Sequence, residues 1–204
     1  MIYLNDHIGE INIEEALRQV GPQRAAYALR YRRDLDRRLS LAVFLLLQQA
    51  LREEYGIREI PQFAYGPNGK PFLKDHPEIH FNLSHCPRAA MCVVSDHPVG
   101  CDIEAVPDEL DMDLCRYCFN DEEVASILAS DAPTLTFTTL WTQKEALLKL
   151  TGDTASLFSS SAPPLSRGGG RRPEGFHLSP LTSHLSPPHV SPDHSYVYTV
   201  CSAS

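Results

Sequence analysis

Two carboxylates stand two residues apart in the segment GCDIEAV, residues 100–106. Its apolar residues predict a β-strand, in which residues i and i+2 point to the same face, so Asp102 and Glu104 lie side by side. Like charges at that spacing repel each other unless a cation lies between them. The segment therefore predicts a strand that binds a cation.

A third carboxylate is available on a predicted helix further along the chain. Trp141, Glu145 and Lys149 recur every four residues and share one face of this helix. Taken alone, the pattern also fits a surface ion pair between Glu145 and Lys149 beside a core tryptophan. Together with Asp102 and Glu104 of the strand, however, Glu145 gives a set of three carboxylate ligands. With Lys149 they fit a Mg²⁺ site that holds substrate phosphates.

Other residues are candidates for phosphate contacts. The segment NLSHC contains Ser84 next to His85, but no GxSxG elbow is present, so a serine hydrolase is not indicated. His85 is either a phosphate ligand or an ordinary histidine, and Lys70 in NGKP is either a phosphate ligand or a solvated turn lysine. A dense basic patch consists of Arg30, Arg32, Arg33, Arg37 and Arg38. Its members either solubilise the surface or bind a terminal phosphate or an acidic protein.

The composition limits the class of protein. With 18 Lys and Arg against 26 Asp and Glu, the net charge of −8 argues against a general nucleic-acid binder. No apolar run is long enough to span a membrane, and the first residues lack the features of a signal peptide, so a cytoplasmic protein is expected. The six cysteines are expected to be reduced, and the single CxxC, Cys115 and Cys118, lacks the partners of a zinc site.

Periodicity and turn residues predict the elements that position these side chains. Helices are expected over 12–20, 23–31, 34–56, 120–129 and 133–150, and strands over 89–96, 99–106 and 195–203. Asn12 and Asn120 are expected N-caps. A turn at Asp96-His97-Pro98 makes the strands before and after it neighbours. The Ser- and Pro-rich stretch 159–195 is expected to be a long loop or poorly ordered.

Four short motifs resemble one enzyme family. VGCDIE (99–104) and WTQKEALLK (141–149) resemble the two signature motifs of the 4′-phosphopantetheinyl transferases. GKP (69–71) and FNLSH (81–85) resemble two upstream motifs of the larger type that activates surfactin synthetase. DRRLSLAVFLLL (36–47) resembles the first long helix of that type. Each motif alone is weak, but four in this order are specific.

The resemblance covers roughly residues 20–152 and implies a fold and a reaction. The implied fold is α+β, with two similar α/β lobes, residues 1–97 and 98–204, related by pseudo-two-fold symmetry. The implied reaction moves the phosphopantetheine arm of coenzyme A onto a serine of an acyl, peptidyl or aryl carrier protein and releases 3′,5′-ADP. A monomer is expected, because members of this type carry both halves of the coenzyme A cleft in one chain. Neither nucleic acid nor a membrane is expected as a partner.

The resemblance also implies roles for single residues. Asp102, Glu104 and Glu145 are expected to hold Mg²⁺ on the pyrophosphate. Glu145, directly or through a metal-bound water, is expected to take the serine proton, and Lys149 to stabilise the departing phosphate. The residues expected to bind the nucleotide or its phosphates are Arg38, Lys70, Pro71, Ser84, His85, Lys144 and Lys149. Among these, Arg38 is assigned to the 3′-phosphate.

Two other functions fit the same residues. A metal-dependent phosphohydrolase or nuclease would use the three carboxylates without a carrier protein. A module that binds coenzyme A or a carrier protein without turnover would follow if the stretch after residue 152, which departs from the family pattern, had cost the chain its activity. The sequence leaves open which carrier protein is served and whether Mg²⁺ or Mn²⁺ is preferred.

Overall fold

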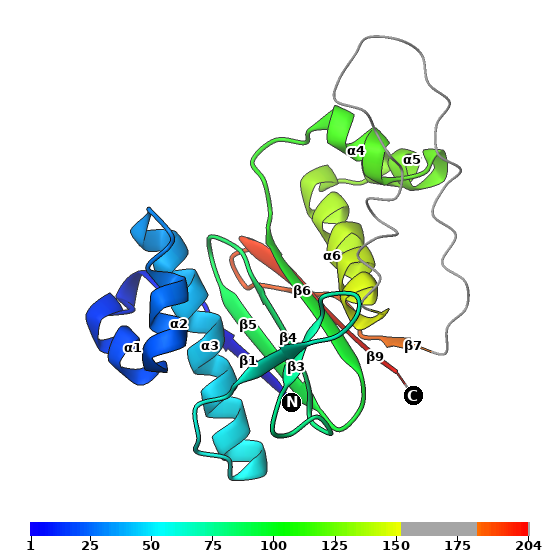
Figure 1. Cartoon of the computed structure of the whole chain (residues 1–204). Helices are drawn as coiled ribbons and strands as arrows, with labels where there is room; N and C mark the ends of the chain where they lie inside the picture. Colours follow the sequence, from blue (N-terminus) through cyan, green and yellow to red (C-terminus); the bar gives the residue numbers. More distant parts are fainter. Residues whose placement is uncertain (152–182, 204) are drawn as a thin grey trace.

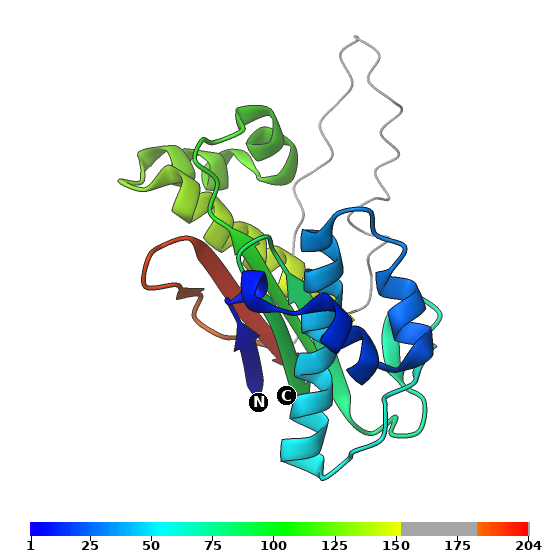
Figure 2. The same cartoon turned by 90° about the vertical axis from the view of Figure 1, so that its left-hand side faces the viewer.

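The computed structural model describes residues 1–151 and 183–203, which form an α+β fold of small antiparallel sheets and six α-helices (Figures 1 and 2). The first half contains β1 (Ile2–Asn5), η1 (Ile8–Glu10), α1 (Ile13–Gln19), α2 (Gly21–Ala28), α3 (Asp34–Tyr55), β2 (Phe63–Tyr65), β3 (Pro71–Leu73), β4 (His80–His85) and β5 (Ala90–Ser95). The second half contains β6 (Val99–Ala105), α4 (Met112–Cys118), α5 (Asp121–Ala129), α6 (Pro133–Thr151), β7 (Ser183–Leu185), β8 (His189–Val190) and β9 (Tyr196–Ala203).

Local signals fix the helix ends as the sequence predicts. The Asn12 side chain accepts a hydrogen bond of 3.2 Å from the Glu15 amide at the start of α1. Asn120 and Glu123 form a reciprocal capping box at the start of α5. Gly56 ends α3 in the left-handed conformation, with φ of 70°, that favours glycine. These predictions of helix boundaries are confirmed.

The two main sheets are built from different halves of the chain. β1, β5 and β4 form one antiparallel sheet, while β6 pairs with β9, which also pairs with β7 and β8. β5 and β6 were predicted as neighbours; they contact each other in one hydrophobic cluster, but each forms its ladder with other strands. The reason is that β1 and β4 occupy both edges of β5, so β6 lies beside β4 instead, where the Cys101 amide donates to the Asn82 side chain at 2.8 Å.

Part of the predicted loop over 159–195 is ordered, and that part of the prediction is wrong. Residues 183–185 and 189–190 pair with β9, and a tight turn follows them. In this turn the Ser191 hydroxyl donates to Asp193 at 2.8 Å and accepts from the Ser195 amide at 2.9 Å. Strand pairing and these local bonds order a segment whose composition alone favours a loop. The rest of the predicted loop, up to residue 182, lies outside the described residues.

Helices cover the sheets on separate sides. α3 packs on the β1-β5-β4 sheet and α6 packs on β6 and β9 (Figures 1 and 2). A cluster that includes Met91, Val93 and Ile103 joins strands from both halves of the chain. The two halves therefore share buried surface, and the division into lobes at residue 97 stays a prediction.

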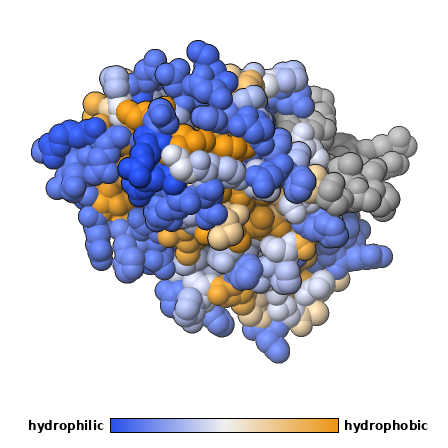
Figure 3. Space-filling model, turned by 90° about the horizontal axis from the view of Figure 1, so that it is seen from below, coloured by the Kyte–Doolittle hydropathy of each residue, from blue (hydrophilic) through white to orange (hydrophobic). Residues whose placement is uncertain are grey.

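The helices that the structure describes are not of the membrane-spanning kind. Within residues 1–151 and 183–203, every helix is too short or too polar to cross a bilayer. On the face drawn in Figure 3, apolar areas are interspersed with hydrophilic side chains, which is normal for the surface of a folded protein.

Gly100 allows the close approach of α6 to β6. A Cβ atom at this position would come closer to the Ala146 carbonyl oxygen and the Leu150 amide nitrogen than van der Waals contact allows. Both obstructing atoms belong to helix backbone, which cannot rotate away as a side chain does. Any larger residue would push α6 off the strand that carries Asp102.

We therefore expect Gly100→Ala to lower the free energy of unfolding by about 2–4 kcal/mol, because the helix backbone must shift. Urea unfolding followed by circular dichroism measures the loss. Gly9→Ala is the matched control, because a Cβ at Gly9 would meet nothing within 4 Å. Equal stability of the two variants would show that the contact with α6 is unimportant.

Candidate active site

β6 presents its polar residues to α6 and its apolar residues to the core. Cys101 and Ile103 are fully buried in the cluster shared with β5. Gly100, Asp102 and Glu104 alternate with them and therefore point to the opposite face, toward the helix. The alternation predicted from the sequence is thus the reason that two carboxylates face α6.

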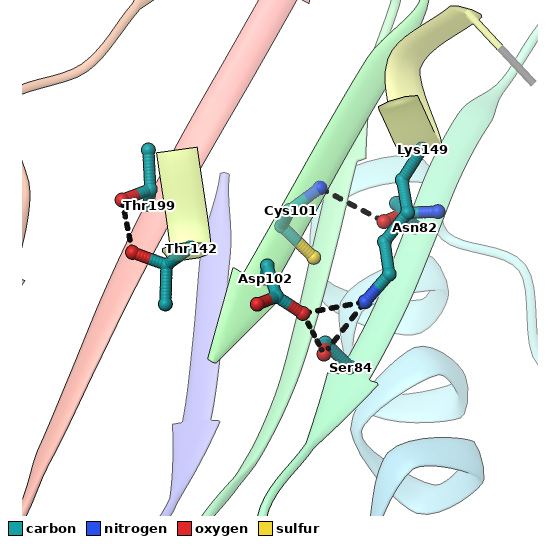
Figure 4. A network of polar contacts seen from close by, with 7 residues as sticks. All are labelled: Asn82, Ser84, Cys101, Asp102, Thr142, Lys149 and Thr199. Atoms are coloured by element: carbon teal, nitrogen blue, oxygen red, sulfur yellow. Dashed lines mark hydrogen bonds and ion pairs between the residues drawn. The ribbon is translucent and has the colours of Figure 1, made fainter. Parts of the chain in front are cut away.

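Asp102 is the centre of a buried polar network drawn from three elements (Figure 4). Its carboxylate is 2% exposed, and Oδ1 accepts from the Lys149 ammonium of α6 at 2.6 Å. The same oxygen accepts from the Ser84 hydroxyl of β4 at 2.9 Å, and Lys149 also donates to that hydroxyl at 3.0 Å. The ion pair raises the pKa of Lys149, although burial opposes this, so the lysine is charged at neutral pH.

The other oxygen of this carboxylate has no partner. Asp102 Oδ2 is inaccessible to solvent and makes no hydrogen bond. An unpaired buried carboxylate oxygen is costly, and natural proteins tolerate it mainly where a ligand or ion completes the arrangement.

Glu104 and Glu145 experience the charge on Asp102. Burial and then Asp102 raise the pKa of Glu104 to about 7, against the effects of Lys149 and a hydrogen bond from Trp141. Burial and Asp102 also raise the pKa of Glu145. Asp102 thus penalises the charged forms of both glutamates in a partly desolvated space.

The donor set fits a hard divalent cation. Such an ion would give Asp102 Oδ2 a partner and would relieve the repulsion that raises the pKa of Glu104 and Glu145. Among the residues that the structure describes, no three such side chains are already close enough together to hold a metal. The fit therefore rests on the chemistry and electrostatics of the carboxylates, without a preformed coordination shell.

A second cationic group lies at the end of β4. Burial, followed by the charges of Lys149 and Arg24, lowers the pKa of His85. Arg24 stacks over the rings of Tyr27 and Phe44, at 4.8 and 5.1 Å from their centroids. Its Nη2 donates to the backbone oxygen and the hydroxyl of one serine of α3, while its inaccessible Nε has no partner. A bound anion would offset the positive charges of Lys149 and Arg24 that act on His85.

Arg24 is not among the residues that the sequence indicates, whereas Arg38 is. The Arg38 Nε instead donates to the Ile11 carbonyl at 3.2 Å, and the arginine that influences His85 is Arg24. Both belong to a segment rich in arginine, and helical periodicity alone does not tell which one faces β4. The Pro at the start of α2, two residues before Arg24, was the available signal that a new helix with its own orientation begins there.

Two lysines predicted to bind phosphates make other contacts. Lys144 donates to Glu123 at 2.8 Å and lies over the Phe119 ring, 4.5 Å from its centroid, so it joins α6 to α5. Lys70 donates to the carbonyls of Val99 and Leu150. These contacts explain the two positions structurally, and their phosphate roles stay predictions.

Pro71 lines a pocket at the opposite end of β4 from His85. This pocket of about 280 Å³ is formed by Gly66, Lys70, Pro71, Phe72, Ile79, His80, Phe81, Pro98 and Leu150. Its wall is mainly apolar. The predicted site residues therefore do not form one group. Ser84, Asp102 and Lys149 form the buried network, Lys70 and Pro71 line this pocket, and the contacts of Arg38 and Lys144 belong to neither.

The chain is similar to known enzymes. Residues 98–201 match the family model of the 4′-phosphopantetheinyl transferase superfamily. The 4′-phosphopantetheinyl transferase psf-1 of Bacillus pumilus is 34% identical over 161 residues, which cover 78% of this chain and 69% of the relative. Sfp of Bacillus subtilis (strain 168) is 26% identical over 159 residues, covering 76% and 70%. AcpT of Salmonella typhi is 35% identical over 119 residues, covering 56% and 59%.

The raised pKa of Glu104 predicts how stability depends on pH. Between about pH 4.5 and 7 the folded state binds more protons at this group than the unfolded chain, so the free energy of unfolding falls as pH rises. Glu104→Gln removes this loss. Without metal, we expect the variant to exceed the wild type by about 1–2 kcal/mol at pH 8, after allowing for partial exposure, and to show no such gain at pH 4.

Urea unfolding in EDTA at the two pH values measures this difference. Added Mg²⁺ should raise the unfolding midpoint of the wild type at pH 8 and leave that of Glu104→Gln nearly unchanged. Glu109→Gln, at an exposed position, is the control. Equal stability of Glu104→Gln and the wild type at pH 8, or an equal response to Mg²⁺, would contradict the electrostatic argument.

Proposed function

The chain belongs to the 4′-phosphopantetheinyl transferase superfamily, and we propose that it transfers the 4′-phosphopantetheine group of coenzyme A to a serine of an apo carrier protein. The serine oxygen forms a bond to the phosphorus that carries pantetheine. The bond from that phosphorus to the bridging oxygen breaks, and 3′,5′-ADP leaves. The observation that supports this reaction most directly is the buried Asp102–Lys149–Ser84 network within a chain of this family.

We propose that Asp102, Glu104 and Glu145 hold Mg²⁺ at this network. The unpaired Asp102 Oδ2 and the raised pKa of the two glutamates support the assignment. When bound, the ion neutralises phosphate charge and polarises the phosphorus under attack.

Glu145 is the proposed general base for the serine hydroxyl. Its pKa is raised by burial and by Asp102, which makes the carboxylate a stronger proton acceptor than an exposed glutamate. Lys149 has three N–H donors, of which Asp102 and Ser84 occupy two. The third is available to a phosphate oxygen, where the ammonium stabilises the charge on the leaving 3′,5′-ADP.

The terminal 3′-phosphate of coenzyme A is assigned to Arg24 and His85. The charge of Arg24 acts on His85, and this imidazole gains a proton more readily once an anion is present. The assignment of the 3′-phosphate to Arg38, whose Nε donates to the Ile11 carbonyl, stays a prediction beside this one. Pro71 and the apolar pocket beside it are proposed to contact the nucleotide.

The cellular setting is proposed from composition. The six cysteines, five of them buried, are proposed to be reduced thiols, which suits a reducing compartment such as the cytoplasm. The net charge of −8 disfavours nucleic acid as a partner. We propose a monomer that meets its carrier protein in the cytoplasm, away from membranes.

The transfer itself is the first prediction of this proposal. An apo acyl carrier protein incubated with the protein, coenzyme A and Mg²⁺ should gain the mass of one phosphopantetheine, read by intact-protein mass spectrometry. Glu145→Gln should slow the gain by about 10²–10⁴-fold, because the proton acceptor is lost. EDTA should abolish it.

Glu122→Gln, at an exposed position of α5, is the matched control and should retain full activity. Several unrelated carrier proteins should be tried with folding verified by circular dichroism. Absence of any mass gain by the wild type would contradict the proposed transfer and favour a module that binds coenzyme A without turnover. Release of 3′,5′-ADP without a carrier protein would favour a phosphohydrolase.

Arg24 is tested by comparing coenzyme A with its 3′-dephospho analogue. Arg24→Met should weaken the binding of coenzyme A about tenfold or more, because a charged hydrogen bond is lost, and should hardly affect the analogue. Isothermal titration calorimetry measures both dissociation constants.

Arg38→Met is the control for this comparison, and thermal unfolding should verify that both variants fold. If Arg38→Met, and not Arg24→Met, removed the preference for coenzyme A over the analogue, the assignment to Arg24 would be wrong.

A further inference from the structure

Lys70 joins two segments that are remote from it in sequence. Its ammonium donates to the carbonyl oxygens of Val99 and Leu150, both at 3.0 Å. The side chain is partly buried, and this desolvation lowers the pKa of Lys70. A lysine that loses hydration and gains two backbone acceptors has a defined position.

A rigid turn presents this lysine. In the loop between β2 and β3, the Gly66 amide donates to the Lys70 carbonyl at 3.0 Å and the Gly69 amide donates to the Gly66 carbonyl at 2.9 Å. Gly69 has φ of 77°, a conformation that glycine adopts without strain. The backbone of Lys70 is therefore fixed, and its side chain extends from an anchored base.

The two acceptors lie at the ends of the elements that form the site. Val99 is the first residue of β6, and Leu150 is in the last turn of α6. Carbonyls in the last turn of a helix lack an intrahelical partner, and a cation there also interacts favourably with the helix dipole. Lys70 therefore acts as a cap for α6 and bonds the strand beside it with the same ammonium.

The reactive residues are close to these acceptors along the chain. Lys149 directly precedes Leu150, and Asp102 follows Val99 by three residues. The 2.6 Å contact between Lys149 and Asp102 depends on how α6 lies along β6. Gly100 sets the separation of helix and strand at that point, but a close contact does not by itself prevent the helix end from moving along the strand. The Lys70 ammonium, which donates to both β6 and α6, does prevent this movement.

We propose that Lys70 is a positioning residue for the transfer reaction, clamping the end of α6 to the start of β6 so that Lys149 stays on Asp102. The inference rests on the proposed function and differs from a direct phosphate contact for Lys70. The surroundings favour the clamp, because the adjoining pocket is lined mainly by apolar side chains such as Ile79, Phe81 and Pro98, which do not stabilise an anion.

Steady-state kinetics of Lys70→Met separate the two roles. Methionine keeps an unbranched side chain and removes the ammonium. A lost clamp should reduce kcat about tenfold or more through misplacement of Lys149, while KM and the calorimetric dissociation constant for coenzyme A stay within about twofold of the wild type. Lys74→Met, at an exposed position in the same part of the chain, is the control and should match the wild type.

Hydrogen exchange tests the clamp independently of enzymatic activity. Lys70→Met should speed exchange in peptides from the last turn of α6 and the start of β6, and leave peptides from α3 unchanged. If the wild-type protein shows no transfer, the proposed function is wrong. Hydrogen exchange in these peptides would still test whether the clamp exists.

Three outcomes would overturn the inference. A tenfold rise in KM for coenzyme A with kcat unchanged would identify Lys70 as a direct ligand. A lower unfolding temperature with unchanged kinetics would identify a purely structural residue. Unchanged exchange in both peptides would show that the two hydrogen bonds do not hold the elements together.

Discussion

The placement of the elements that form the site depends on the nearly complete burial of one carboxylate, that of Asp102. A buried, uncompensated charge costs several kcal/mol, so the Asp102 carboxylate requires Lys149 and Ser84 beside it. Lys149 reaches it only because α6 lies directly on β6, and α6 lies there only because Gly100 has no side chain. Ser84 reaches it because β4 runs alongside β6, joined through the Asn82 side chain. One charge thus specifies how a helix and two strands from different sheets are placed.

The same arrangement is not optimised for stability. A protein under selection for stability alone would pair both oxygens of Asp102, yet Oδ2 has no partner. It would also separate Glu104 and Glu145 from Asp102, whereas their pKa values are raised by this proximity. Departures of this kind concentrate at sites where a ligand supplies the missing charge, since the folded protein bears the repulsion until the ligand arrives. The strain is thus an argument for function that is independent of the family resemblance.

The local parts of this site follow from the sequence, and the long-range parts do not. Alternation over residues 100–106 and the spacing of Glu145 and Lys149 determine which side chains share a face, and both predictions hold. The pairing of β6 with β9, about one hundred residues later, cannot be predicted from the sequence of either strand. Nor does periodicity tell Arg24 from Arg38, because the orientation of each helix toward β4 is decided by tertiary packing.

Three lysines illustrate how the fold alters electrostatics that composition suggests. The family resemblance assigns Lys70, Lys144 and Lys149 to the phosphates. In the structure, Lys144 pairs with Glu123, Lys70 bonds two carbonyls, and Lys149 is largely neutralised by Asp102. Coenzyme A brings a doubly charged pyrophosphate and a terminal phosphate. Of the basic groups discussed, Arg24 is proposed for the latter, and Lys149 keeps a single N–H donor for the former. Little protein charge then remains for the pyrophosphate, and a divalent cation held by three carboxylates is the compensation that the chemistry requires.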